Sequence, residues 1–411
     1  MELLFLTELL GLEVHDIKGR VIGRVKDAGL VPVVHRSRID RYLVGAGSTW
    51  LTVRYDQVRD IGLGGVFLRD EQLTPYHNDE WMLRIVRDLL DQQIIDAAGR
   101  KVVRVSDITF EIVRTPEGAT LEIRDVDIGL RSVLRRVAQG VVPPTWVRRV
   151  QAPIAPHSIP WGACTIVEAD PQRRLHLNVS YSALEAMHPA DIADIVEDLG
   201  PDEREAIFET IDEEVAGEAL SEVDRDVQAS ILESLEPEKA ADIIEEMAPD
   251  QAADVLGELE QATADEILGE MEPASKTEVT ELLEYPADSA GGLMTTDYVA
   301  VAERATAAEA LAEIRAHDHL LDALTTIYLV DQAGRLTGAV PLARLAVASP
   351  DAPLRALAAE PPQAVAVDER QDRVTDRFDK YNLLALPVVD ARNRLVGVIT
   401  ADDIISVLRI A

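Results

Sequence analysis

The feature that most constrains this chain is a repeat of twelve residues that runs from residue 188 to residue 283. Each of its eight units ends on an apolar residue, and the eighth position of each unit is also apolar. Apolar residues three and four positions apart form one face of a helix, and a proline or acidic residue near a unit start is a helix-start signal. A helix of about two turns cannot bury that face alone, so we expect the units to stack into a compact superhelix.

The same segment carries most of the charge of the chain. Residues 182–285 hold 33 Asp and Glu against four Lys and Arg, and the net charge of the whole chain is −34. Two carboxylates about 4 Å apart repel by ~4 kcal/mol at an effective dielectric constant of about 20. Carboxylate oxygen is the ligand that Mg²⁺, Ca²⁺ and Mn²⁺ prefer, and Asp250 and Asp254 would share one helix face. The pattern predicts either a solvated acidic surface or a divalent-cation site.

Charge and composition also exclude several classes of function. A net charge of −34 argues against nucleic acid or an anionic membrane as the main partner. The sequence has no run of 18 apolar residues, so we expect no transmembrane helix. The single cysteine, Cys164, excludes an intramolecular disulfide and is typical of a reducing cytosol. Because the sequence also shows no nucleophile beside a general base, we predict a cytoplasmic protein that is not an enzyme.

The N-terminal region is predicted to be rich in β-strands. Short alternating strands flank a turn at Asp16–Gly19, and a similar pattern recurs around Gly99 as a weak internal duplication. This region resembles the PRC-barrel, a small β-barrel that also occurs in ribosome maturation factors, and the resemblance implies an interaction module. Five prolines in residues 141–161 favour an extended linker or a final edge strand. We expect a PRC-barrel-like domain over 1–75 and a second β-rich half with a Pro-rich linker over 76–181.

The C-terminal part, residues 286–411, contains two similar α/β halves. Its pattern resembles a tandem pair of CBS domains, at about 295–349 and 354–411, a family that binds adenine nucleotides and has regulatory roles. The run from Gly397 to Asp403 fits the family pattern of Gly, two apolar residues, Ser or Thr, two further residues and Asp. The resemblance implies that Thr400 meets a phosphate and Asp403 the ribose of ATP or another adenine nucleotide.

The segment from Glu284 to Val301 looks like the junction between the acidic N domain and the CBS pair of MgtE magnesium transporters. Together, 182–285 and 286–411 therefore resemble the cytosolic Mg²⁺ sensor of that family. There, Mg²⁺ holds the acidic domain against the CBS pair and closes the pore, and the domains separate without it. By position, the resemblance assigns metal ligands to Glu218, Asp250, Asp254, Asp372 and Asp403. Two further ligand positions of the family hold Asn382 and Ser406 here.

These resemblances predict a multidomain chain with an N-terminal PRC-barrel-like β-barrel, an all-α acidic superhelix and a C-terminal α/β tandem CBS pair. We expect a non-enzymatic regulator that senses divalent cations, Mg²⁺ ahead of Mn²⁺ or Ca²⁺. It would form a homodimer through its CBS domains and act on a membrane metal-ion transporter in trans, which would bring it to the membrane. Because the chain ends after the second CBS helix, we expect the sensor without the pore. The alternatives are an adenine-nucleotide-responsive CBS adaptor and, opposed by the acid content, a ribosome- or RNA-associated factor.

Overall fold

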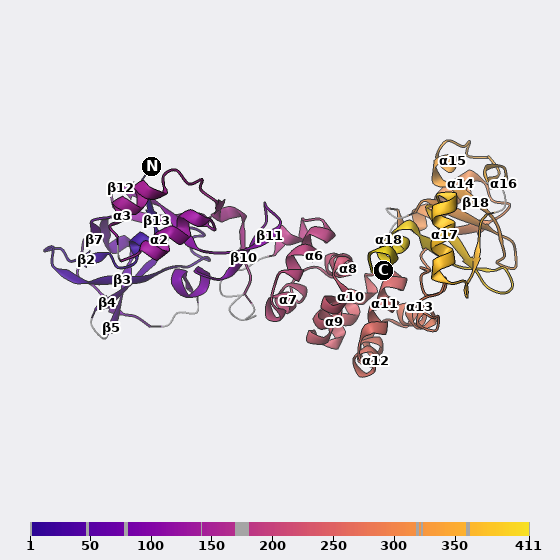
Figure 1. Cartoon of the computed structure of the whole chain (residues 1–411), viewed down its shortest axis with the longest axis horizontal. Coiled ribbons are helices and arrows are strands. Elements are labelled where there is room, and N and C mark those ends of the chain that lie inside the picture. Colours follow the sequence, from indigo (N-terminus) through magenta and orange to yellow (C-terminus); the bar gives the residue numbers. More distant parts are fainter. Residues whose placement is uncertain are drawn as a thin grey trace. The chain divides into compact units, whose positions relative to one another are not determined.

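The computed structural model describes residues 2–46, 49–77, 81–140, 142–168, 181–317, 320–321, 324–358 and 362–410. The chain divides into two compact units, whose elements are drawn in Figure 1. The first unit holds Met1–Val215 with Glu222–Asp224, and the second holds Ala216–Ser221 with Arg225–Ala411. The boundary therefore falls inside the helical repeat, in α8 (Glu213–Glu222).

The N-terminal region is β-rich, as predicted, and its described residues form three sheets. The largest has the order β6-β7-β2-β3-β4-β5-β8, with β9 paired to β3, a second has the order β1-β12-β13-β14, and a third has the order β11-β10-β15. The strands are β1 (Leu3–Phe5), β2 (Glu13–His15), β3 (Val21–Leu30), β4 (Arg41–Ala46), β5 (Thr49–Arg54), β6 (Val58–Gly62), β7 (Gly65–Leu68), β8 (Thr74–Pro75), β9 (Leu83–Arg84), β10 (Gln93–Asp96), β11 (Lys101–Arg104), β12 (Asp107–Thr115), β13 (Gly118–Asp127), β14 (Ser158–Pro160) and β15 (Cys164–Ile166). Three short helical turns accompany them, at Tyr55–Gln57, Ile85–Leu89 and Trp161–Ala163.

The two halves of this region share one hydrophobic core. Strand β1 pairs with β12 in antiparallel register, so that Leu4 lies opposite Phe110. Both side chains are buried in the same cluster as Val25 of β3 and Val126 of β13. Burial of large apolar side chains is worth about 1.5–3 kcal/mol each. The halves therefore stabilise each other, and the division at residue 75 remains a proposal.

The predicted internal duplication is visible in two hairpins, β2–β3 and β10–β11. In each, an aspartate at the start of the turn accepts backbone N–H groups: Asp16 from Lys18 and Arg20, and Asp96 from Ala98 and Gly99. The left-handed position differs between the two turns. Gly19 has φ of +76° in the first hairpin, whereas Arg100 has φ of +50° in the second. The two turns are thus offset by one residue.

Three helices complete the N-terminal region: α1 (Leu6–Leu9), α2 (Leu130–Ala138) and α3 (Pro144–Gln151). Helix α3 lies inside the proline-rich segment that the sequence predicts to be extended. Pro144 occupies the first helical position, where a missing N–H and a fixed φ are compatible with a helix. Among the described residues of this segment the one strand is β14, near its end, which is the edge strand of its sheet.

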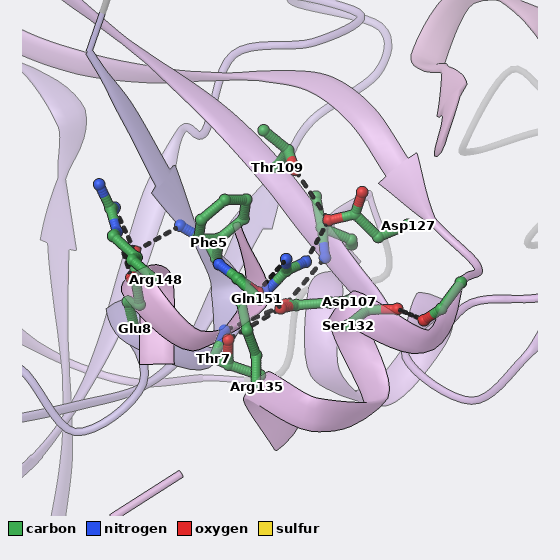
Figure 2. A network of polar contacts seen from close by, with 12 residues as sticks. Phe5, Thr7, Glu8, Asp107, Thr109, Asp127, Ser132, Arg135, Arg148 and Gln151 are labelled. Carbon is green, nitrogen blue, oxygen red and sulfur yellow. Dashed lines mark hydrogen bonds and ion pairs between the residues drawn. The ribbon is translucent and has the colours of Figure 1, made fainter. Parts of the chain in front are cut away.

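A buried polar network attaches α2 to strands β12 and β13, as Figure 2 shows. Arg135 of α2 donates to Oδ2 of Asp107 at 2.7 Å and also pairs with Asp127. Thr7 and Thr109 donate their hydroxyls to these two carboxylates at 2.8 Å. The side chains of Arg135 and Asp107 are 5% and 0% exposed. Burial raises the pKa of Asp107 and of Asp127, and the charge of Arg135 opposes that rise.

A second arginine fixes α3 beside this network (Figure 2). Arg148 of α3 binds both carboxylate oxygens of Glu8 at 2.6 Å, and Glu8 accepts the backbone N–H of Phe5 at 3.1 Å. The guanidinium groups of Arg135 and Arg148 lie 3.8 Å and 5.3 Å from the centre of the Phe5 ring. Helix α3 is therefore held to the N-terminal segment by an ion pair, and both helices contact that segment through cation–π contacts with Phe5.

The twelve-residue repeat folds as predicted, with one helix for each unit within the described residues. The helices are α6 (Pro189–Glu197), α7 (Pro201–Phe208), α8, α9 (Arg225–Ser234), α10 (Pro237–Glu245), α11 (Pro249–Glu258), α12 (Gln261–Glu270) and α13 (Pro273–Leu283), after a short α5 (Ser182–Glu185). Proline is the first residue of five of these helices, directly after the connection from the preceding helix. Eighth-position side chains such as Ile195, Ile207 and Ile243 are 0% exposed.

The C-terminal part forms two similar α/β halves, as predicted. In each half a parallel strand pair is followed by an antiparallel strand: β16 (Ala300–Ala302), β17 (Thr326–Val330) and β18 (Leu336–Pro341), then β19 (Val365–Ala366), β20 (Ala385–Val389) and β21 (Leu395–Thr400). The helices are α14 (Ala307–Ala316), α15 (Leu342–Ala346), α16 (Leu354–Leu357), α17 (Gln371–Tyr381) and α18 (Ala401–Ile410). Tyr328 and Val398 join the two halves in one apolar cluster.

Candidate metal centre

Three of the five predicted ligand residues lie close enough for their charges to interact: Asp250 and Asp254 of α11, and Asp403 of α18. Pro249 begins α11, so Asp250 lies in its first turn and Asp254 one turn later. The buried face of α11 packs against α9 and α13, which fixes the helix within the repeat. Asp403 lies in the first turn of α18, directly after β21. The negative charge of Asp403 raises the pKa of Asp250, and that of Asp254 raises the pKa of Asp403.

Asp250 is the most constrained of these acids. Its Oδ1 atom is buried and has no hydrogen-bond partner in the described structure. Burial raises the pKa of Asp250 to about 7, the charge of Asp403 adds to the rise, and a hydrogen bond from the side chain of Thr295 opposes it. An unsatisfied buried acceptor costs about 1–3 kcal/mol, and more when it is charged. The carboxyl of Asp250 is therefore expected to be protonated or, when it is ionised, to have a cation beside it.

Thr295 connects this acid to the second CBS half. Its backbone N–H donates to the carbonyl of Val398 at 2.8 Å, and the N–H of Val398 donates back to the carbonyl of Thr295 at 2.9 Å. Val398 belongs to β21, which leads directly into α18 and Asp403. Thr295 is only 7% exposed. The segment before β16 is thus anchored on the strand that positions Asp403.

Asp403 also closes the turn between β21 and α18. Its Oδ2 accepts the backbone N–H of Thr400 at 2.6 Å and the Thr400 hydroxyl at 2.9 Å. Burial raises the pKa of Asp403 to about 6, and the hydrogen bonds from Thr400 oppose that rise. The two residues predicted to bind an adenine nucleotide are therefore in contact with each other, at the same turn as the predicted metal ligand.

Asp254 already has a cationic partner. Arg225 of α9 binds Oδ2 of Asp254 at 2.9 Å and Oε1 of Glu258 at 3.1 Å. Burial raises the pKa of Asp254, and the charge of Arg225 opposes that rise. Neither Arg225 nor Thr295 is predicted as a site residue from the sequence. Arg225 could have been singled out, because it is one of only four cations in residues 182–285.

The other two predicted ligands are not brought into this cluster. Glu218 lies on α8 and is exposed, and Asp372 is 68% exposed and pairs with Arg370 at 3.4 Å. In the described part of the chain, no three His, Cys, Asp or Glu side chains form a group that could hold a metal ion. Mg²⁺ usually keeps several of its six waters and needs only one or two carboxylates. The orphaned Oδ1 of Asp250 beside Asp403 fits such a largely hydrated ion.

Among the described residues, no helix is both long enough and apolar enough to cross a membrane.

Comparison with protein families covers the helical repeat and the C-terminal part. Residues 187–288 match the MgtE intracellular N domain, and residues 290–351 and 346–410 each match the CBS domain. The chain therefore carries an MgtE N domain followed by a tandem CBS pair, as predicted. The described N-terminal sheets confirm a β-rich region, whereas its barrel form and its resemblance to the PRC-barrel remain predictions.

Curated proteins match over about a third of the chain. A stretch of 130 residues is 39% identical to the magnesium transporter MgtE of Thermus thermophilus, and it covers 32% of this chain and 29% of that protein. The magnesium transporter MgtE of Bacillus subtilis is 31% identical over 129 residues, which cover 31% of this chain and 28% of that protein. The chain thus spans less than a third of the length of these relatives.

Two solved structures match a larger share. The crystal structure of the cytosolic domain of the Mg²⁺ channel MgtE in complex with ATP is 32% identical, with a TM-score of 0.53 over 57% of this chain and 98% of that structure. The crystal structure of the soluble part of a magnesium transporter is 25% identical, with a TM-score of 0.53 over 59% of this chain and 94% of that structure. The matched part of the chain therefore corresponds to the cytosolic part of MgtE transporters.

Proposed function

Because the chain carries an MgtE N domain and a tandem CBS pair, we propose that it is a regulatory protein that senses a divalent cation between α11 and the second CBS half. The observation that carries the proposal is the buried Oδ1 atom of Asp250, which has no hydrogen-bond partner within the described residues, on a carboxyl that also feels the charge of Asp403. Mg²⁺ is the cation that the relatives' names favour, and Mn²⁺ and Ca²⁺ prefer the same oxygen ligands.

The proposed sensing step uses repulsion between carboxylates. Without a cation, the charges of Asp250, Asp254 and Asp403 oppose contact between α11 and the CBS pair. A hydrated divalent cation between them would neutralise that charge and stabilise the contact. The contact would then be transmitted through Thr295 and Val398 into β21. The metal concentration would thus determine whether the acidic helices contact the CBS pair.

The direct test measures compaction. Small-angle scattering of the full chain is expected to give a smaller radius of gyration in millimolar Mg²⁺ than in EDTA at equal ionic strength. Mg²⁺ should also protect the segment 286–298 from protease, since this segment carries the anchored Thr295. A radius of gyration and a cleavage rate that are the same in both conditions would refute the proposal.

Arg225 offers a second test that separates direct pairing from net charge. Arg225→Gln and Lys276→Gln each remove one positive charge from the repeat, and Lys276 forms no ion pair within the described residues. Because Arg225 occupies Asp254 and is about half exposed, its loss should lower the metal-free stability by about 0–1 kcal/mol. It should also raise Mg²⁺ affinity several-fold more than Lys276→Gln does. Calorimetric titration and thermal melts measure both, and equal effects of the two variants would contradict this role.

A second candidate function is an adenine-nucleotide-responsive adaptor. Thr400 and Asp403 support it, because they match the nucleotide motif of CBS domains and lie together at the start of α18. The solved MgtE cytosolic domain in complex with ATP also supports it. If nucleotide binds here, the double variant Thr400→Ala with Asp403→Asn should abolish ATP binding in a titration. Arg344→Ala, in the first half, should leave it unchanged, and the reverse result would reject the site.

The partner is proposed to be a membrane metal-ion transporter in trans, reached by a homodimer of this chain. Ile405 and Leu408 of α18 are 59% and 60% exposed, and Leu384, directly before β20, is 64% exposed. Exposed apolar side chains grouped at one place favour a protein interface. The scattering experiment also reports the oligomeric state. In this proposal the protein is cytoplasmic and meets the membrane only through the transporter.

A further inference from the structure

An open cavity of about 1010 Å³ lies in the N-terminal region. Its walls come from the loop before β4, the facing ends of β4 and β5, and β8 with the residues that follow it. It belongs to the first compact unit, whereas the candidate metal centre belongs to the second. Small-molecule sites in proteins usually measure roughly 300–1,000 Å³. The cavity is therefore large enough for a ligand, and the proposed cation sensing does not use it.

Arg38 is the unusual residue in this cavity. Its guanidinium lies 3.9 Å from the centre of the Tyr55 ring, and both residues line the cavity. The Nε atom of Arg38 is buried and has no hydrogen-bond partner within the described residues. No carboxylate of the described structure forms an ion pair with Arg38 either. Part of this cation has thus lost water without gaining a hydrogen bond, which is costly unless an anion compensates the charge.

The remaining charges of the cavity do not supply that anion. Asp40 is the one carboxylate among the described lining residues, and its Oδ2 lies 3.3 Å from Nε of Arg41. Arg54 also lines the cavity and pairs with Asp56 at 3.0 Å. Arginines therefore outnumber carboxylates at the described wall. A planar guanidinium stacked on an aromatic ring is suited to a phosphate or carboxylate, which it can bind through two parallel hydrogen bonds.

The same cavity also offers an apolar surface. Val34 and Trp81 line it and are 66% and 50% exposed. An inorganic anion would leave this surface and most of the volume unused. We propose that the cavity binds a small organic anion. Arg38 would hold its phosphate or carboxylate group, and its apolar or aromatic part would lie against Val34 and Trp81.

The test titrates the full chain with phenyl phosphate, with benzoate and with inorganic phosphate. Each titration is done in EDTA, and calorimetry measures the binding. Phenyl phosphate and benzoate distinguish the two anionic groups, and inorganic phosphate tests the need for an apolar part. Arg38→Gln should weaken the binding of the preferred probe by roughly tenfold to a hundredfold, the range for a charged hydrogen bond. Arg59→Gln, an exposed arginine on β6 outside the cavity, is the charge-matched control and should leave binding unchanged.

Arg38→Lys tests whether loss of structure, and not loss of the binding group, explains weaker binding of the probe. It keeps the charge but not the planar, stacked group, so it should restore only part of the affinity while its thermal melt stays close to that of the wild type. Equal binding by the wild type, Arg38→Gln and Arg59→Gln would overturn the proposal. So would the absence of binding of all three probes at millimolar concentration.

Discussion

Replacement of Arg135 by alanine is expected to destabilise the N-terminal region by about 3–5 kcal/mol, the cost of removing one partner of a buried ion pair. The variant would leave Asp107 and Asp127 buried without their cation (Figure 2). Both carboxyls would then be expected to take up protons, because burial already raises the pKa of each. It would also detach α2 from the ring of Phe5. Urea unfolding followed by tryptophan fluorescence measures the loss.

The neighbouring Arg136 is the matched control. It pairs with Asp91, and the two side chains are 37% and 50% exposed. Exposed ion pairs contribute about 0–1 kcal/mol, so Arg136→Ala should change the free energy of unfolding by no more than that. A similar loss for the two variants would mean that helix propensity, not the buried network, sets the effect. Arg135→Met, which keeps apolar volume, should lie between Arg135→Ala and the wild type.

Replacement of Asp250 by asparagine is expected to stabilise the metal-free protein and to remove most of its response to Mg²⁺. A carboxyl whose pKa is raised by folding lowers stability at every pH above that pKa, because the folded state then disfavours the ionised form. Burial and the charge of Asp403 raise the pKa of Asp250 to about 7. At pH 8 the uncharged amide should therefore increase the free energy of unfolding of the second unit, on the order of 4 kcal/mol for a rise of about three pKa units.

The response to metal should change in the opposite direction. A ligand present at about 100 times its dissociation constant stabilises the native state by ~2.7 kcal/mol, and this gain disappears when binding is lost. Thermal melts at pH 8, with EDTA and with Mg²⁺ at equal ionic strength, measure both effects. Asp242→Asn, an exposed acid on α10, controls for the change in net charge. An equal Mg²⁺-induced shift in wild type and Asp250→Asn would show that this acid is not part of a metal centre.

The helical repeat and the CBS pair could be predicted because their signals are local. The period of twelve residues, with proline at unit starts and apolar residues at fixed positions, specifies both the helices and the faces that they bury. Ile195 and Ile243 are buried at the positions that the period assigns to them. The polar network around Arg135 carries no such signal. Its partners, Asp107 and Asp127, lie 28 and 8 residues away on different strands, and only the fold brings them together.

The candidate site was predictable only in part for the same reason. The spacing of Asp250 and Asp254 places them on one helix face, but their approach to Asp403 is a long-range contact. The resemblance to a known family supplied that pairing. Arg225, 29 residues from Asp254, enters the site from another helix, and Thr295 enters it from the segment before β16. Glu218 and Asp372 match the family by position, yet they lie outside the cluster.

The position of Asp403 has a thermodynamic consequence. One carboxylate belongs both to the proposed cation site, through Asp250, and to the proposed nucleotide site, through its hydrogen bonds with Thr400. Two ligands that share a residue cannot bind independently. Whatever factor the nucleotide imposes on cation affinity, the cation must impose the same factor on nucleotide affinity, because the two routes to the doubly bound state have equal free energy. One nucleotide titration with Mg²⁺ and one with EDTA therefore give the coupling free energy for both ligands.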